Sequence, residues 1–182
     1  MTRFIVAVTC AAGFSQIDVE PRLPAPLLSE SYHAVPASQM VVKDMAVAMP
    51  TLQGSSSEWL KEFEKVPSEL RRAASRPSPT KPHRLDPSLF PPGTRLVPAS
   101  AVERIFTGAG VEENWSAFST QFKSRGWLAF SDALLTGDRL DALVYYEARC
   151  GGLCGEGGYA WLRRDTVSSP WRIEKKIISW MS

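Results

Sequence analysis

Histidine and cysteine are scarce in this sequence, which limits the chemistry that its side chains can carry out. Two histidines, His33 and His83, and three cysteines occur in 182 residues. A structural zinc ion needs four such ligands, and the histidines lie far apart in the chain. Neither the G-x-S-x-G motif of hydrolases nor the H-E-x-x-H motif of zinc proteases is present. We therefore expect no metal, no cofactor and no catalytic residues, and favour a non-enzymatic role.

An excess of one charge and a long apolar run are also missing. Lys and Arg total 21 and Asp and Glu total 19, a formal net charge of +2. A dedicated nucleic-acid-binding domain is usually strongly basic, so we expect no nucleic-acid partner. A transmembrane helix takes about 20 apolar residues, and the sequence has no run of that length. We expect no membrane span in the mature chain, which is long enough for one folded domain.

The N-terminus has the pattern of an export signal. A single arginine precedes an apolar run at residues 4–8, and small residues follow. We predict a signal peptide over residues 1–14, which places the mature protein outside the cytoplasm, periplasmic or secreted. A buried first strand and a lipid anchor at Cys10 are the alternatives. Three prolines within residues 18–28 then predict an extended tether at 15–29.

Residues 30–182 are expected to form a single α+β domain. Apolar residues recur at helical spacing within 55–75 and 113–122, which predicts helices there. Pro67 is expected to break the first of them. Between the two, six prolines in the insert 76–92 predict a long loop or an extended arm.

Two capping boxes indicate where helices begin. Ser55 with Glu58, and Ser100 with Glu103, have the spacing at which a hydroxyl and a carboxylate satisfy backbone N–H groups of a first turn. We therefore expect a helix to follow each serine.

The C-terminal third predicts β-structure. Stretches rich in β-branched and aromatic residues, bounded by turn residues, are typical of strands. Such stretches cover 126–135, 140–149, 159–164 and 171–181, with shorter ones at 40–47 and 94–98. The TGDR sequence between the first two is a hairpin-type turn. A change of apolar parity between Ile173 and Ile178 predicts a bulge or a strand that crosses an edge of the sheet. We predict N-terminal helices and Pro-rich loops packed on a C-terminal four-stranded antiparallel meander.

The stretch ARCGGLCGEGGYAWL, residues 148–162, combines two cysteines with several glycines. Once a signal peptide is removed, Cys150 and Cys154 are the remaining cysteines, and an even count in an oxidising compartment favours a disulfide. Closing so small a loop stabilises the fold by about 2 kcal/mol in the chain-entropy model. We predict a disulfide that staples a glycine-rich turn formed by Gly151, Gly152, Gly155, Gly157 and Gly158.

Other interpretations of this stretch stay open. Arg149 and the amides of a glycine-rich turn would lower a thiol pKa and make the cysteines redox-active, but the C-x-x-C spacing of the familiar thiol oxidoreductases is missing. The glycine order matches neither the dinucleotide nor the P-loop motif, so a phosphate cradle is less favoured. A nucleophilic cysteine would need a base that the sequence does not place.

Two further features are candidates for partner contacts. Basic residues without any intervening acid lie at the end of the first predicted helix and in the arm behind it: Arg71, Arg72, Arg76, Lys81 and Arg84. A solvated helix end is the simpler interpretation, and contact with an anionic surface, such as phospholipid headgroups or an acidic wall polymer, is the alternative. Four tryptophans of the predicted sheet are expected mostly in the core: Trp127, Trp161, Trp171 and Trp180. Two of them on the solvent face would form a platform for a ligand or partner.

The C-terminal third resembles a family of small exported bacterial proteins of unknown function. The shared features are the ALVY strand, the CGGLCG turn and a tryptophan-rich last strand that ends in W-x-S, with a Trp-and-Phe helix upstream. The insert 76–92 departs from that pattern. The resemblance implies an exported α+β protein and does not imply any chemical activity.

From these observations we predict an exported, envelope-associated binding or accessory module that is not an enzyme. Its expected partner is an anionic envelope surface or another exported protein. The alternative is a thiol–disulfide redox protein that uses Cys150 and Cys154.

Overall fold

The computed structural model describes residues 24–51, 61–76, 81–108 and 110–182. The predicted signal peptide, Cys10 and the capping pair Ser55–Glu58 lie outside the described residues. No helix among the described residues is long and apolar enough to cross a membrane.

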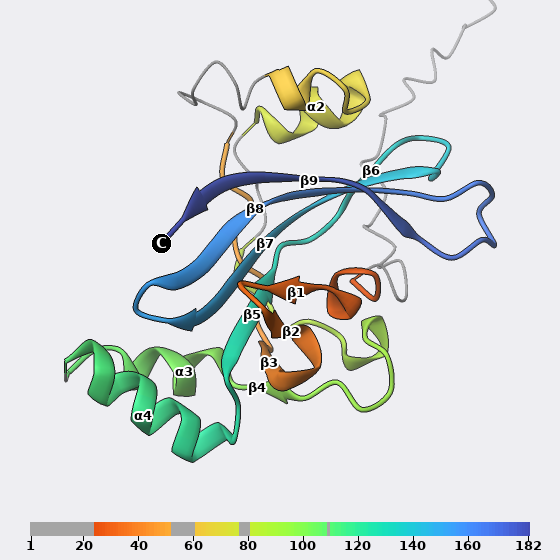
Figure 1. Cartoon of the computed structure of the whole chain (residues 1–182). Coiled ribbons are helices and arrows are strands. Elements are labelled where there is room, and N and C mark those ends of the chain that lie inside the picture. Colours follow the sequence, from red (N-terminus) through yellow and green to blue (C-terminus); the bar gives the residue numbers. More distant parts are fainter. Residues whose placement is uncertain (1–23, 52–60, 77–80, 109) are drawn as a thin grey trace, which may run out of the picture.

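A seven-stranded mixed sheet forms the centre of the molecule (Figure 1). Its strands are β3 (Met40–Lys43), β4 (Leu96–Val97), β5 (Gly126–Phe130), β6 (Leu134–Leu135), β7 (Asp141–Gly151), β8 (Cys154–Arg163) and β9 (Arg172–Met181). The order is β4-β3-β5-β7-β8-β9, and β6 pairs with β7. Strand β3 runs parallel to β4 and β5, whereas all other pairs are antiparallel.

The α+β class is confirmed, but the predicted four-stranded antiparallel meander is wrong as a description of the sheet. Strands β5, β7, β8 and β9 do pair antiparallel in chain order. The sheet continues beyond β5 because β3 is buried along its whole length and pairs on both sides. Parallel pairing needs a long crossover. Helices α3 (Ala99–Ile105) and α4 (Val111–Phe122) lie in the chain between β4 and β5.

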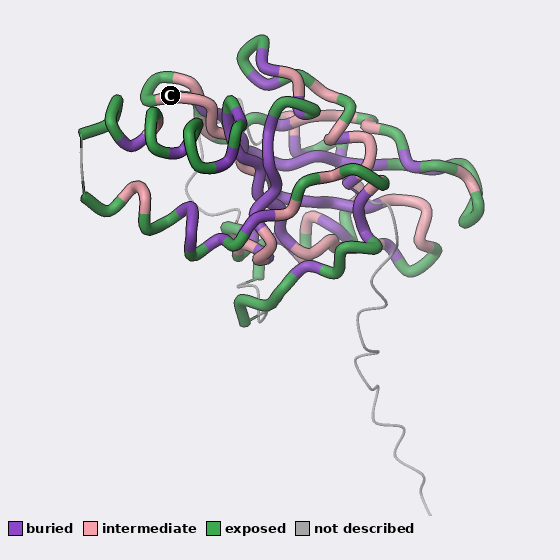
Figure 2. The backbone as a smooth tube through the Cα atoms, turned by 90° about the horizontal axis from the view of Figure 1, so that it is seen from below, coloured by how far each residue is buried: buried purple, intermediate pink, exposed green. Residues whose placement is uncertain are grey.

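The two faces of the sheet are covered differently, because successive residues of a strand point to opposite faces. On one face, Val144 and Tyr146 of β7 belong to a single core cluster that includes the N-terminal segment. That segment holds short elements: η1 (Leu27–Ser29), β1 (Ser31–Tyr32), β2 (Val35–Pro36) and η2 (Ala37–Gln39). On the other face, α2 (Ser68–Ala74) packs on Tyr145 and its neighbours, while α3 and α4 form a separate cluster on β3 and β5. Figure 2 shows the buried residues concentrated in the centre of the molecule.

Both proline-rich segments are packed against the domain where the structure describes them. In the expected tether, residues 24–29 contain η1, and Leu27 is fully buried. In the insert, Leu85, Leu89 and Phe90 belong to the main core cluster. Element η3 (Pro87–Leu89) is capped by Asp86, whose pKa is lowered by the hydrogen bond from the Ser88 backbone N–H. The apolar residues between the prolines therefore hold these irregular segments on the core.

The sequence pattern correctly predicts which side of a helix is buried, but it predicts less well how the helix is capped. Trp115, Phe118 and Phe122 lie on the buried side of α4, as their spacing predicts. Pro67 immediately precedes α2, which confirms the predicted break. The capping box of Ser100 with Glu103 is wrong. Helix α3 begins two residues earlier than predicted, at Ala99, whose N–H donates to Asp44 Oδ1 at 2.9 Å, and its N-cap residue Pro98 supplies no side-chain hydrogen bond.

Two shifts of register between β8 and β9 confirm the predicted bulge. One lies between Gly157 and Gly158 and the other between Trp161 and Leu162. Thr136 and Arg139 close the predicted TGDR turn between β6 and β7, since the Arg139 N–H donates to the Thr136 carbonyl at 2.9 Å. Each of these features depends only on local spacing and turn chemistry.

Candidate binding site

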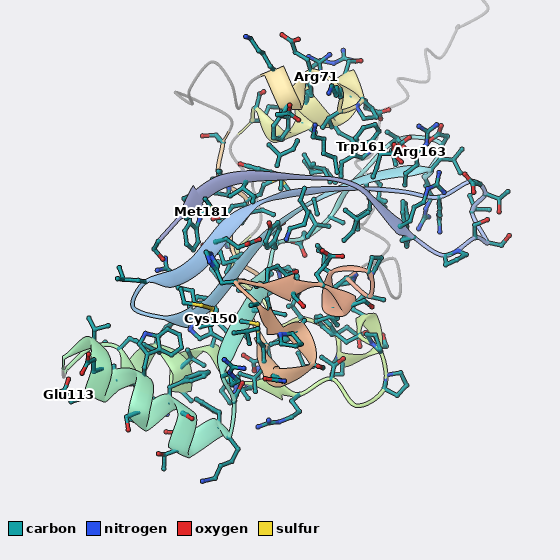
Figure 3. All side chains as sticks on the ribbon, viewed as in Figure 1. Arg71, Glu113, Cys150, Trp161, Arg163 and Met181 are labelled. Carbon is teal, nitrogen blue, oxygen red and sulfur yellow. A yellow bond between two sulfur atoms is a disulfide. The ribbon has the colours of Figure 1, made fainter. Side chains whose placement is uncertain are left out.

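A disulfide joins Cys150 and Cys154 at the end of the β7–β8 hairpin, as predicted, with a Cα–Cα distance of 5.0 Å. Both cysteines are half-buried, and the tip between them is formed by Gly152 and Leu153. Leu153 is 90% exposed. Figure 3 shows Cys150 at this end of the molecule, away from α2 and its Arg71. The crosslink therefore fixes an otherwise exposed hairpin tip.

Three of the five glycines assigned to the turn lie inside β8. Gly155, Gly157 and Gly158 pair with β7 and β9, whereas Gly151 ends β7 and Gly152 is at the tip. A Cβ on Gly157 would overlap the Trp180 indole, and the nearest atoms to one on Gly155 also belong to Trp180 and Ser182. Gly155 and Gly157 thus leave room for the Trp180 ring against the sheet.

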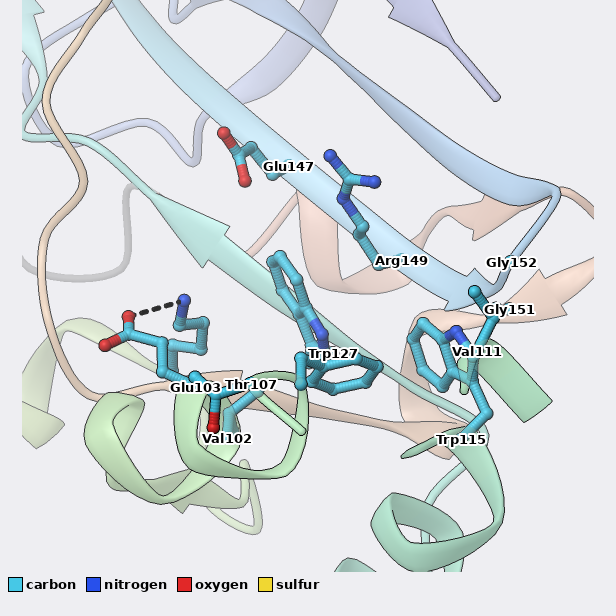
Figure 4. Close-up of a pocket in the computed structure, with 12 residues that line it drawn as sticks. Val102, Glu103, Thr107, Val111, Trp115, Trp127, Glu147, Arg149, Gly151 and Gly152 are labelled. Carbon is cyan, nitrogen blue, oxygen red and sulfur yellow. Dashed lines mark hydrogen bonds and ion pairs between the residues drawn. The ribbon is translucent and has the colours of Figure 1, made fainter. Parts of the chain in front are cut away.

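A pocket of about 510 Å³ lies on this face of the sheet, between the hairpin, β5 and the helices α3 and α4 (Figure 4). Its walls combine apolar side chains with two charges of each sign. The lining residues are Lys43, Val102, Glu103, Phe106, Thr107, Val111, Trp115, Trp127, Glu147, Arg149, Gly151 and Gly152. Pockets of this size are common for small ligands. Val102, Phe106, Trp115 and Trp127 of this lining belong to the α3–α4 cluster or pack against it, and no residue of the α2 cluster lines the pocket.

Lys43 and Glu103 form the charged wall on one side of the pocket. Lys43 Nζ lies 3.1 Å from Glu103 Oε1 and 4.7 Å from the centre of the Trp127 ring. The lysine side chain is 11% exposed and the glutamate 64%. The buried ammonium is therefore stabilised by both a carboxylate and an aromatic face.

Glu147 is oriented by Tyr145 of its own strand β7 and, through that tyrosine, by Trp180 of β9. The Tyr145 hydroxyl donates to Glu147 Oε1 at 3.1 Å, and Trp180 Nε1 donates to the Tyr145 oxygen at 3.0 Å. Burial raises the pKa of Tyr145 to about 12, and the Glu147 charge acts in the same direction. The tyrosine therefore stays a neutral donor, and the Glu147 carboxylate is held in place.

Arg149 lies two residues further along the same face of β7. Its guanidinium carbon is 4.4 Å from the centre of the Trp180 ring. In the described part of the chain, no oxygen accepts a hydrogen bond from this guanidinium, and Arg149 forms no ion pair with Glu147. Figure 4 shows the two side chains rising from the same strand, close to Trp127. Stacking on Trp180 thus orients a guanidinium whose donors are left for other acceptors.

Aromatic rings close the opposite end of the pocket. The rings of Phe106 and Trp115 meet edge to face at 4.9 Å between centroids. Val111 is 60% exposed at the rim, and a Cβ on Gly152 would meet its Cγ1 at 2.6 Å. The buried Trp127 Nε1 has no hydrogen-bond partner among the described residues. The hairpin tip and α4 therefore touch, and the disulfide holds one edge of the pocket.

A second hollow, of about 890 Å³, is larger but chemically poorer. It lies between residues 25–29 and the turn 167–171 and is lined mainly by serines and prolines. Its charged residue, Arg164, donates from Nε to the Arg139 carbonyl at 2.8 Å and stacks on Trp171 at 4.3 Å. Because that guanidinium already contacts a backbone carbonyl and a tryptophan, we favour the first pocket as the ligand site.

The other residues singled out from the sequence have local partners or stay at the surface. Arg71 Nε donates to the Val66 carbonyl at 3.1 Å, and Arg84 Nε lies 3.7 Å from Asp44 Oδ2. Arg72, Arg76 and Lys81 are exposed.

The histidines serve local contacts as well. His33 Nε2 lies 3.1 Å from the Gly155 carbonyl oxygen, and His83 Nε2 lies 3.1 Å from Asp132 Oδ1. Among the described residues, no group of three or more His, Cys, Asp or Glu side chains could hold a metal ion.

Sequence reasoning missed the central residues of this pocket. Lys43, Glu103 and Glu147 were not predicted as site residues, and Arg149 drew notice only beside the cysteines. A signal did exist: Tyr145, Glu147 and Arg149 alternate along a strand, so they share one face. Tyr145 on this face of β7 is buried in the core, and the charged residues that follow it indicate that the helices no longer cover the strand there.

Comparison with protein-family models, curated proteins and solved structures finds no match for this chain. The resemblance of the C-terminal third to exported bacterial proteins therefore stays a prediction from its motifs. Function must be argued from the pocket itself.

Proposed function

We propose that this chain is an exported, envelope-associated binding protein, without catalytic activity, that takes a small ligand in the pocket beside the stapled hairpin. The pocket carries the proposal. It combines aromatic rings with charged groups that are held in position by their neighbours, as ligand sites do. The disulfide supports the location, because such bonds persist in oxidising compartments.

The alternative function is thiol–disulfide exchange by Cys150 and Cys154. The half-buried position of both cysteines at an exposed tip favours it. Exchange requires a reduction potential near that of cellular thiol couples. A potential far below the glutathione range would exclude this role and leave the bond as a structural staple.

The binding function is tested by screening small fragments against the disulfide-intact protein and mapping amide shifts by NMR. We expect the shifts to cluster on Trp115, Trp127 and Arg149. A bulky side chain at the exposed rim position in Thr107→Trp should remove them. The matched control Glu64→Trp, at an exposed site near α2, should not. Scattered shifts, or shifts that survive Thr107→Trp, would contradict the proposal.

Export is tested by the intact mass of the protein from its native host, alkylated with and without reduction. We expect a chain that starts near residues 13–16 and whose thiols are labelled only after reduction. An uncleaved chain with free thiols would overturn the location and bring the redox alternative forward.

A further inference from the structure

We propose that the ligand is an apolar zwitterion of the α-amino-acid type, with its carboxylate on Arg149 and its ammonium on Glu147. This inference rests on the proposed binding function and names the ligand class for the same pocket. Its apolar group would lie against Phe106 and Trp115.

The charges of the pocket point to a ligand that carries both signs. Lys43 and Glu103 neutralise each other at 3.1 Å. Glu147 and Arg149 are left, opposite in charge and half-buried on one strand face, with no ion pair between them in the described structure. Tyr145 holds the first and Trp180 stacks on the second. Each is therefore positioned by a neighbour while the two remain open to a third group.

The spacing of the two side chains suits one amino-acid backbone. Alternate residues of a strand are about 6.7 Å apart, and Glu147 and Arg149 are alternate residues of β7. In an α-amino acid the ammonium nitrogen and the carboxylate carbon are about 2.5 Å apart. A charge-assisted hydrogen bond adds about 2.8 Å at each end. The Glu147 carboxylate and the Arg149 guanidinium would therefore lie about 8 Å apart with the ligand between them, a distance that two flexible side chains can reach.

Ligands with a single charge fit this arrangement less well. A simple anion on Arg149 would lie beside the Glu147 carboxylate, and a simple cation on Glu147 would lie beside the Arg149 guanidinium. Either ligand would also remove water from the other charged group without forming a hydrogen bond to it, which raises the free energy of the complex. A zwitterion satisfies both groups at once, and an apolar side chain matches the aromatic end of the pocket.

The test compares three probes that share one aromatic side chain: L-phenylalanine carries both charges, phenylalaninamide only the ammonium, and N-acetylphenylalanine only the carboxylate. Calorimetry should show L-phenylalanine binding at least about tenfold more tightly than either derivative, the effect of one lost charge-assisted hydrogen bond. Equal or weaker binding of L-phenylalanine would overturn the inference. If fragments still map to the pocket, the proposed binding function survives that result, whereas the absence of any fragment there removes both.

Two variants separate the two ends of the ligand. Arg149→Gln should weaken L-phenylalanine by at least about tenfold and leave phenylalaninamide unaffected, while Glu147→Gln should spare N-acetylphenylalanine. The matched controls Arg104→Gln and Glu113→Gln remove the same charges from exposed sites on α3 and α4 and should change none of the affinities. Loss of all three probes in both variants, with the fold intact, would contradict the assignment of one charge to each residue.

Discussion

On the face of the sheet covered by the N-terminal segment, Glu156 accepts a hydrogen bond from the Tyr146 hydroxyl at 2.8 Å and lies 2.9 Å from Lys176 Nζ. On the opposite face, Glu147 accepts a hydrogen bond from Tyr145, but its cationic neighbour Arg149 stacks on a tryptophan instead of pairing with it. A glutamate and a basic residue thus form an ion pair on one face (the closed pair), whereas on the other face they lie close together without pairing (the open face).

The difference follows from how each face is covered. The first face carries one continuous core cluster, and the Lys176 ammonium lies 4.5 Å from the centre of the Tyr32 ring within it. The second face carries two clusters, and the pocket lies between the α3–α4 cluster and the β7–β8 hairpin. A charge under a continuous layer must find its partner inside the protein. A charged side chain that lines an open pocket can instead form its ion pair with a ligand.

The largest effect is expected from breaking the closed pair. Glu156→Ala leaves the Lys176 ammonium, 20% exposed, without its carboxylate and the Tyr146 hydroxyl without its acceptor. We expect a loss of about 3 kcal/mol in the free energy of unfolding. Glu147→Ala, the matched change on the open face, should cost at most about 1 kcal/mol. Urea unfolding of the disulfide-intact proteins measures both, and equal costs would refute the contrast between the faces.

A smaller effect is expected from the glycine that supports the open face. In Gly157→Ala the new methyl group overlaps the Trp180 indole, so the ring must leave Arg149 and its hydrogen bond to Tyr145. We expect a loss of about 1 to 2 kcal/mol in unfolding free energy and a shifted indole N–H resonance for Trp180. Gly108→Ala, where a Cβ has no neighbour within 4 Å, is the control and should be close to neutral. An unshifted indole resonance in Gly157→Ala would show that Trp180 does not depend on this glycine.

The smallest effect is confined to alkaline pH and compares the tyrosines of the two faces. Burial raises the pKa of all four tyrosines, that of Tyr145 to about 12. The hydrogen bond to Glu156 raises that of Tyr146 further. Because the folded pKa exceeds the unfolded value of about 10, the stability that comes from the neutral hydroxyls is full below pH 10. It is lost as the pH rises through about 12.

Tyrosinate absorbance and circular dichroism, followed together with rising pH, measure this. We expect no tyrosinate at pH 10 and a first component near 12, which Tyr145→Phe removes. Ionisation centred near pH 10 in the folded protein would contradict the burial of these hydroxyls.

Features that depend on neighbours in the chain were predictable. The spacing of Trp115, Phe118 and Phe122 sets the buried side of α4 whatever the fold around it. The TGDR turn and the break at Pro67 follow from backbone preferences of single residues. Cys150 and Cys154 are close enough in sequence that a hairpin between them suffices for the disulfide.

The sequence by itself therefore determined the α+β class, the antiparallel pairing of the last strands and the stapled hairpin. Only the tertiary structure decided that β3 pairs in parallel, that Asp44 caps α3, and that Lys43 meets Glu103 across 60 residues of chain. Gly155 and Gly157 of β8 gained their role from Trp180, on another strand. Helical and strand periods act over a few residues, whereas the pocket depends on strand order and on where the covering layers end, which distant segments decide together.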